Sequence, residues 1–396
     1  MHAVLAQAPG ALATENMLSG MLLPLALALF ALGLLTVRTA PPWSPWKLAV
    51  LAGEFGHWIA PFAALVAGSA WASASPPGAT PKATTALALA ATILLLKPAL
   101  QARRLAASLP RALGERFGEP TAPATPFSLS RLYLGQPPVR VHPREYTFGP
   151  GLPLDFYPAQ GRNGHGPAPC VIVIHGGGWD GGDRHQLPEL NHHLAHRGYA
   201  VAAISYRLAP SSIWPAQRED TLAALAFLKA HAAELGIDPT RLVLLGRSAG
   251  GQIAQTVAYT AADPAIRGVI AFYAPSDLIF GYQSTHEEDM LRSPSLMRQF
   301  LGGTPETARA NYESASALFH VHAHCPATLL LHGRNDSIAW HVHSGRLDER
   351  LGTAGVPRCY VALPWATHAF DFTLQGPGGQ LSTFAVDWFL DRVTGA

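Results

Sequence analysis

The sequence predicts an α/β fold with a mostly parallel sheet and helices on both faces, preceded by about three membrane-spanning helices. Two observations support this prediction. From about Val139 onward, apolar runs of strand length alternate with helical stretches, which is typical of a parallel sheet covered on both faces. Before residue 104, long apolar runs contain few charges. The chain is therefore expected to have two unlike parts, one in a membrane and one globular.

The composition agrees with a membrane part and excludes several other classes. Hydrophobic residues make up 48% of the 396 residues and charged residues 14%, whereas a soluble domain has about 25% charged residues. The net charge of +2 is too small to indicate binding to nucleic acid. Cys170, Cys325 and Cys359 are scattered and form no Cys-x-x-Cys pair, so neither a disulfide framework nor a structural zinc site is expected.

Residues 1–104 are predicted to form a membrane anchor, with helices near 17–37, 48–71 and 83–100. The first run carries no charge and has the length of about 20 residues that a span requires. A cleaved signal peptide is an alternative, but it would need a basic start, and no Lys or Arg precedes Met17. A soluble helical domain is another, but these Leu- and Ala-rich runs lack the polar face that it would need.

Basic residues predict an orientation in the cell (inner) membrane. Arg38 and Lys47 flank the first link, and Arg103 and Arg104 follow the third run. The positive-inside rule then places the N-terminus outside and the C-terminal part in the cytoplasm. If the third run does not cross, the C-terminal part lies outside instead.

Polar and aromatic residues mark the second run. Trp43 and Trp46 precede it and are suited to an interfacial belt. Glu54 and His57 interrupt it and are three positions apart, so they share one helix face. A mutual hydrogen bond and a role in transport are both open for this pair.

After an expected linker at 105–135, residues 136–396 are predicted to form the globular domain. Helices are expected at 215–234 and 249–262. The long interval at 275–320 is expected to form a cap over the site. Because ligands of such sheets bind beyond the carboxyl ends of the strands, the residues after each strand matter most. The expected strands are 139–149, 152–159, 170–175, 199–206, 241–246, 268–274, 327–333 and 358–364.

Three residues that follow strands have the types that nucleophilic catalysis needs. Ser248 lies in Gly-Arg-Ser-Ala-Gly at a strand-to-helix junction, a turn that only small flanking residues permit. Asp336 and His368 each follow a later strand. His368 can take the proton of Ser248, and Asp336 can orient the imidazole and stabilise its positive charge. This chain order at three strand ends argues against separate roles as an N-cap, a turn residue and a packed loop histidine.

Three glycines directly follow the strand 170–175, in His-Gly-Gly-Gly-Trp. Attack on a carbonyl creates an oxyanion, which needs backbone N–H groups at about 3 Å. Glycine lets the backbone approach that closely, since no Cβ intervenes. We expect the donors to be the N–H groups of Gly176, Gly177 and Ala249, with His175 bracing the loop.

These motifs resemble the α/β-hydrolase esterases that carry an HGGG oxyanion loop, among them the hormone-sensitive-lipase-like carboxylesterases and the bacterial feruloyl-esterase-like hydrolases. The resemblance covers roughly residues 140–395 and implies an α/β-hydrolase fold with a small cap. Arg247 stands where hormone-sensitive-lipase-like members commonly have Asp, which favours the feruloyl-esterase-like branch. The resemblance also implies a structural role for Asp220. The matching stretches include HGGGWDGGD (175–183), SYRLAP (205–210), GIDPTRLVLLGRSAGG (236–251), LLLHGRND (329–336) and THAF (367–370).

The function expected from these residues is that of a membrane-anchored serine carboxylesterase or lipase-like hydrolase, which forms an acyl-enzyme with a small-molecule or lipid-like ester and uses no cofactor. An acyltransferase, an amidase or peptidase, and a non-catalytic binding protein on the same fold remain alternatives. Trp179 and Trp340 lie beside the catalytic loops and are candidates for the substrate pocket, with plain packing as the alternative. Histidines at 191–196 and 319–325 lack the converging ligands of a zinc site, so no metal is expected.

Overall fold

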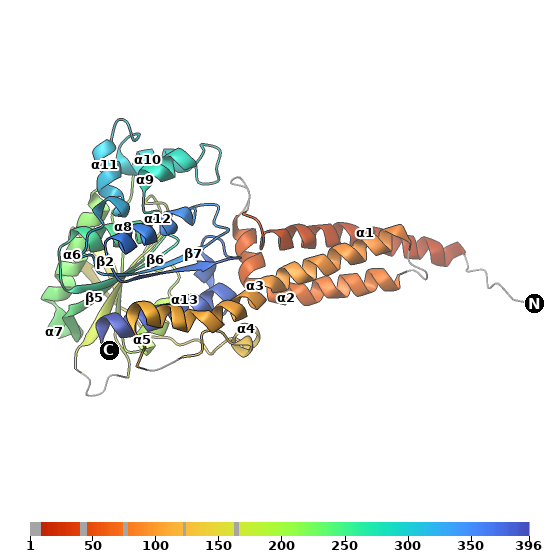
Figure 1. The fold of residues 1–396 in the computed structure, drawn as a ribbon, viewed down its shortest axis with the longest axis horizontal. Helices are drawn as coiled ribbons and strands as arrows, with labels where there is room; N and C mark the ends of the chain where they lie inside the picture. Colours follow the sequence, from red (N-terminus) through yellow and green to blue (C-terminus); the bar gives the residue numbers. More distant parts are fainter. Residues whose placement is uncertain (1–8, 40–45, 74–77, 122–123, 162–165, 396) are drawn as a thin grey trace, which may run out of the picture.

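The structure, a computed structural model, describes residues 9–39, 46–73, 78–121, 124–161 and 166–395, with side chains from residue 21 onward. Three long helices extend from one side of a globular domain (Figure 1). They are α1 (Pro9–Leu34), α2 (Trp46–Ala72) and α3 (Ala79–Phe117). A large part of these helices therefore projects away from the sheet-containing part.

Two of these helices are long and apolar enough to cross a membrane. They are α2 and α3, while the apolar part of α1, Met21–Leu34, is shorter than a span requires. Of the three expected spans, the described residues thus provide two helices of sufficient length, and the described apolar part of the third is too short. Small residues such as Ala63 and Ala91 are buried where the helices pack together, and Trp58, Phe62 and Ile93 point outward.

Helix α3 joins the two parts of the molecule. Its first half packs with α1 and α2 through Ala88 and Leu95, and its second half packs on the sheet through Leu109 and Leu113. At 1.5 Å per residue, its 39 residues span about 58 Å. The segment 105–117 is therefore helical and buried in part, although the sequence suggested a linker, because Leu and Ala on one helix face pack against the globular core.

The globular domain contains one sheet of eight strands in the order β1-β2-β4-β3-β5-β6-β7-β8. Strands β1 and β2 are antiparallel to each other, and β2 is antiparallel to β4. The remaining neighbours run parallel, as in the pairing of Val171 with Val201 and Val243. This confirms a mostly parallel sheet. The strands are β1 (Arg144–Phe148), β2 (Leu152–Tyr157), β3 (Ala168–Ile174), β4 (Ala200–Ile204), β5 (Ile237–Arg247), β6 (Ile266–Phe272), β7 (Ala327–Gly333) and β8 (Arg358–Leu363).

Each parallel strand sends side chains into two cores, one on each face of the sheet. Ile172 and Ile174 of β3 pack into one core, while Val171 and Val173 pack into the other. This alternation is the period of two that a strand imposes. The second core is covered by α3, by α5 (Glu189–His196) and by α13 (Pro377–Thr394). The first is covered mainly by α6 (Ala216–Ala230), α7 (Ala232–Leu235), α8 (Ala249–Thr260) and α12 (Val342–Thr353).

The interval at 275–320 forms a small group of helices on one side of the domain (Figure 1). Met297 and Phe300 of this group are buried in the first core, so it is a packed part of the domain. Its elements are α9 (Leu278–Ser284), α10 (Ser293–Leu301), α11 (Arg309–Ala315) and the short helix η1 (Ala317–His320). Two other short helices are α4 (Leu129–Leu134) and η2 (Phe370–Phe372).

Glu54 and His57 of α2 contact residues outside their own helix, in the globular domain and in α4. Glu54 accepts hydrogen bonds from Trp365 Nε1 at 3.3 Å and from the Gly378 N–H at 2.8 Å. His57 Nε2 lies 3.1 Å from the carbonyl oxygen of Leu132 in α4. The two side chains therefore share a helix face without bonding to each other, since each has its own partner outside α2.

Candidate active site

The turn at Ser248 joins the end of β5 to the start of α8. Ser248 has φ 52° and ψ −120°, a strained conformation for a residue with a side chain. The turn also leaves no room at its flanks. A Cβ on Gly246 would lie 2.1 Å from the carbonyl oxygen of Gly250, and one on Gly250 would lie 2.2 Å from that of Ile174. The glycines are thus required by close backbone contacts, and the turn presents Ser248 at the carboxyl edge of the sheet.

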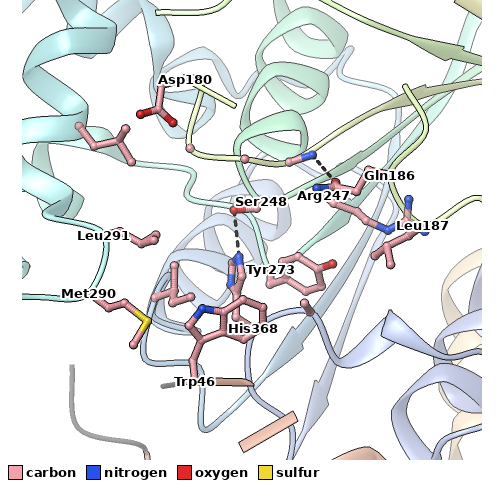
Figure 2. A pocket seen from close by; sticks show the side chains of 16 residues that line it. Trp46, Asp180, Gln186, Leu187, Arg247, Ser248, Tyr273, Met290, Leu291 and His368 are labelled. Atoms are coloured by element: carbon pink, nitrogen blue, oxygen red, sulfur yellow. Dashed lines mark hydrogen bonds between the residues drawn. The ribbon is translucent and has the colours of Figure 1, made fainter. Parts of the chain in front are cut away.

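The structure brings Ser248, His368 and Asp336 together. His368 Nε2 lies 2.9 Å from Ser248 Oγ (Figure 2). On the other side of the ring, His368 Nδ1 lies 2.7 Å from Asp336 Oδ2. Asp336 follows β7 and His368 follows β8, so three strand ends supply the three side chains. The distances suit a proton path from the hydroxyl to the imidazole, with the carboxylate fixing the ring.

Asp336 is held as a carboxylate by its surroundings. Its Oδ1 accepts hydrogen bonds from the N–H groups of Ile338 at 2.8 Å and Ala339 at 2.9 Å. Burial by itself would raise the pKa of Asp336, but the charge of His368 and the contacts with His332 and His368 outweigh it and hold the pKa below its usual value. A carboxylate that stays ionised can stabilise an imidazolium on His368.

The glycine loop is arranged differently from the expectation at one position. The N–H of Gly176 donates to Gln186 Oε1 at 2.7 Å, so this donor is already engaged. Gly177 and Gly178 have φ angles of 121° and 63°, which favour glycine. A Cβ on Gly177 would lie 2.2 Å from the carbonyl oxygen of Gly181. Gly178 lines both cavities at Ser248, which makes its N–H a candidate donor that the sequence analysis missed.

A buried ion pair lies next to the turn, because it involves Arg247, the residue before Ser248. Arg247 Nε donates to Asp371 Oδ2 at 2.5 Å, and Tyr273 Oη donates to Asp371 Oδ1 at 2.5 Å. All three side chains are buried. The charge on Arg247, which departs from the hormone-sensitive-lipase-like pattern, is therefore matched inside the domain by Asp371. Another ion pair, between Arg207 and the buried Asp220, fits the structural role expected for Asp220.

Two cavities meet at Ser248. The larger has a volume of about 420 Å³ and the smaller one of about 60 Å³. Ser248 and Gly178 line both of them, whereas His368 lines only the larger. Besides these, the larger cavity is lined by Trp46, Gly176, Gly177, Asp180, Gln186, Leu187, Arg247, Tyr273, Met290, Leu291, Leu296, Ile338 and Ala369 (Figure 2).

Three tryptophans show how far the sequence could identify the pocket. Trp179 is buried, stacks on Phe300 and lines the smaller cavity, which agrees with one of its two expected roles. Trp340 is half-exposed and lines neither cavity. Trp46 lines the larger cavity, although its sequence position suggested only an interfacial belt.

The histidine-rich stretches have ordinary structural partners. His192 Nδ1 accepts the N–H of Val141 at 3.1 Å, and His322 Nε2 lies 3.1 Å from the carbonyl oxygen of Tyr259. Among the residues that the structure describes, no group of three or more His, Cys, Asp or Glu side chains is arranged to hold a metal ion.

Comparison with known families places this geometry in context. The BD-FAE family model matches residues 154–351, which is half of the 396-residue chain. The chain belongs to the BD-FAE family. The match includes the glycine loop, Ser248 and Asp336, and it ends before His368. Membership of this family confirms the resemblance to esterases with the HGGG loop.

Curated relatives and solved structures agree with this family. The probable carboxylic ester hydrolase LipM of Mycobacterium tuberculosis is 32% identical over 260 residues, covering 62% of this chain and 59% of the relative. Esterase LipQ of the same organism is 30% identical over 213 residues, covering 52% and 51%. The chain thus spans about half to three fifths of the length of these relatives. A structure of a bacterial heroin esterase has a TM-score of 0.56 at 23% identity over 67% of this chain and 88% of its own, and confirms the α/β-hydrolase fold.

Proposed function

We propose that the chain is a membrane-anchored serine carboxylesterase. The observation that carries this proposal is the hydrogen-bonded series Ser248, His368 and Asp336, of which Ser248 and His368 line the larger cavity. Its relatives are named as ester hydrolases, which supports an ester as the substrate. No cofactor is needed for this chemistry.

The reaction follows from the positions of the three side chains. Ser248 Oγ attacks the ester carbonyl while His368 Nε2 takes its proton, and Asp336 stabilises the resulting imidazolium. The oxyanion is bound by the N–H of Ala249 and by those of Gly177 and Gly178, since the Gly176 N–H is engaged by Gln186. His368 then donates the proton to the leaving alkoxide. Water, activated by the same imidazole, hydrolyses the acyl-enzyme and restores Ser248.

The anchor is proposed to comprise α2 and α3 as spans, with α1 packed beside them. Outward-facing Trp58, Phe62, Leu65 and Ile93 support contact with lipid, because a soluble helix would place polar residues there. The C-terminal end of α1 and the N-terminal end of α2 lie at the same end of the helices as the globular domain (Figure 1). This arrangement agrees with the basic residues Arg38 and Lys47 near these two helix ends. We therefore place the catalytic domain on the cytoplasmic side of the cell membrane.

The esterase proposal is tested by hydrolysis of p-nitrophenyl acetate and butyrate with washed membranes that contain the full chain. Replacing Ser248 by Ala removes the nucleophile and should lower kcat by ~10⁶-fold. Ser108→Ala is a matched control, because Ser108 is exposed on α3 and its hydroxyl donates to the Leu105 carbonyl of the same helix, so the rate should stay unchanged. Equal rates for Ser248→Ala and the unaltered chain would contradict the proposal.

A further inference from the structure

The candidate active site opens toward the membrane helices. Ser248, Asp336 and His368 follow the carboxyl ends of their strands, and this edge of the sheet faces α1–α3 (Figure 1). Trp46, the first residue of α2, lies edge-on to His368 with a distance of 6.3 Å between ring centroids. A residue at the end of a predicted span is therefore part of the wall of the reaction site (Figure 2).

The position of Trp46 is fixed by contacts farther along α2. Gly53 packs so closely on Trp365 that a Cβ there would touch the indole at 3.5 Å. The next residue along the helix is Glu54, whose carboxylate accepts hydrogen bonds from Trp365 and Gly378 of the catalytic domain. Trp365 lies three residues before His368 in the same loop. The membrane helix and the loop of the catalytic histidine are thus held together by buried polar contacts.

The two cavities can be assigned to the two halves of an ester. His368 must donate a proton to the leaving alcohol oxygen, so the alcohol lies where His368 is. Only the larger cavity is lined by His368, and it also contains Trp46. The smaller cavity is lined by Ala249, the proposed oxyanion donor, and by Ser248, so we assign the acyl group to it. Its volume of about 60 Å³ has room for roughly four to six water-sized groups, which fits a short acyl chain.

The wall of the larger cavity suits an amphiphilic alcohol. Asp180, Gln186 and Arg247 give its lining polar groups, whereas Met290 and Leu291, each 39% exposed, give it apolar surface that is open to the outside. Beside Trp46, Leu48 and Leu51 of α2 are exposed as well. Its volume of about 420 Å³ is in the range of a small-molecule site of about 300–1,000 Å³. An apolar rim next to a span lets an alcohol reach the site without leaving the membrane surface.

We propose that the substrate is a short-acyl ester of an amphiphilic alcohol that resides in the membrane and passes Trp46 to reach Ser248. This proposal rests on the esterase function proposed above. The bond between the acyl carbon and the alcohol oxygen breaks, the Ser248 Oγ–acyl bond forms, and His368 transfers the serine proton to the alcohol. Water then releases a short carboxylic acid to the aqueous phase. The alcohol remains in the bilayer.

Two coumarin esters test this route directly. Both 7-acetoxy-4-methylcoumarin and 7-acetoxy-4-heptadecylcoumarin carry the same acetyl and leaving groups, but only the second is anchored in a bilayer. The full chain is reconstituted in vesicles of phosphatidylethanolamine and phosphatidylglycerol, and the ratio of anchored to soluble hydrolysis is measured. Trp46→Ala should lower this ratio about tenfold, because the anchored alcohol loses the apolar ring that guides it. Trp46→Phe, which keeps an aromatic ring, should retain most of it.

The control is Trp71→Ala, the same substitution at the far end of α2, where Trp71 is exposed. Its ratio should stay within twofold of that of the unaltered chain. An unchanged ratio in Trp46→Ala overturns the route past Trp46, and hydrolysis of the soluble ester without the anchored one overturns a membrane-resident alcohol while leaving the esterase intact. Hydrolysis of neither ester by the unaltered chain overturns both proposals. Preference for the palmitoyl over the acetyl ester of methylcoumarin overturns the assignment of the smaller cavity.

Discussion

Both halves of α2 are rich in apolar residues, but the ionisable residues lie in the first half and the surroundings of the two halves differ. In the first half, Glu54 and His57 are 1% and 3% exposed and bond to groups outside the helix. In the second half, Phe62 and Leu65 are 49% and 68% exposed, although they are larger and more apolar. Burying a polar group is tolerable only where it finds a partner, so the first half belongs with the catalytic domain. The exposed apolar side chains of the second half support its proposed contact with lipid. An apolar run with internal charges can thus contact a globular domain along one half and expose apolar side chains along the other.

The largest effect is expected on the rate of hydrolysis, from a substitution in the catalytic domain. Asp336→Asn keeps the shape of the side chain but removes the charge that orients and stabilises the His368 imidazolium. We expect kcat for p-nitrophenyl acetate to fall ~10⁴-fold. Asp263→Asn is the control, since Asp263 pairs with Lys229 on the surface away from the triad. A fall of less than tenfold in Asp336→Asn would exclude this aspartate from the proton path.

The next largest effect is expected on stability, from a substitution in the first half of α2, which contacts the catalytic domain. Glu54→Ala leaves the Trp365 Nε1–H and Gly378 N–H without their acceptor, and an unsatisfied buried donor costs about 1–3 kcal/mol. The thermal midpoint of the full chain in detergent should therefore fall by several degrees. Glu54→Gln keeps an acceptor, so its thermal midpoint should fall less. Phe62→Ala, in the second half of α2, should change the thermal midpoint little. If Phe62→Ala were the more damaging variant, the division of α2 would be wrong.

The smallest effect concerns a neutral histidine buried in the catalytic domain. Desolvation, aided by the charges of His332 and Arg346, lowers the pKa of His343 to about 3. An unfolded histidine has a pKa of about 6.5, so between these values the unfolded chain binds more protons. The stability that His343 contributes is present above pH ~6.5 and is lost as the pH falls toward 3.

His343→Asn should reduce this loss by up to ~1.4 kcal/mol per pH unit. The measurement is the free energy of unfolding in urea at pH 5 and pH 7, followed by tryptophan fluorescence in detergent. If the free energy of unfolding changed equally between pH 5 and pH 7 in the unaltered chain and in His343→Asn, His343 would not be neutral in the folded state.

The sequence reveals Ser248, Asp336 and His368 because each stands directly after a strand, where local pattern and chain order suffice to find it. It does not reveal Trp46, whose contact with His368 depends on how α2 docks against the domain. Nor does it reveal that the Gly176 N–H, expected to be an oxyanion donor, is engaged by Gln186, since the Gln186 side chain comes from a later loop. Helix α3 was expected to end near residue 100, because its Pro and Arg residues hid a face that packs on the sheet. Sequence periodicity thus does not determine the contacts between segments that are distant in the chain.

The central claim, an activated serine held at a membrane, is tested most directly by a fluorophosphonate probe. Membranes containing the full chain are washed with alkaline carbonate, treated with the probe and digested, and the labelled peptide is identified by mass spectrometry. The account predicts one adduct, on Ser248, in the washed membrane fraction, and none with His368→Ala. An intact, membrane-bound chain that takes up no probe at Ser248 would contradict the claim.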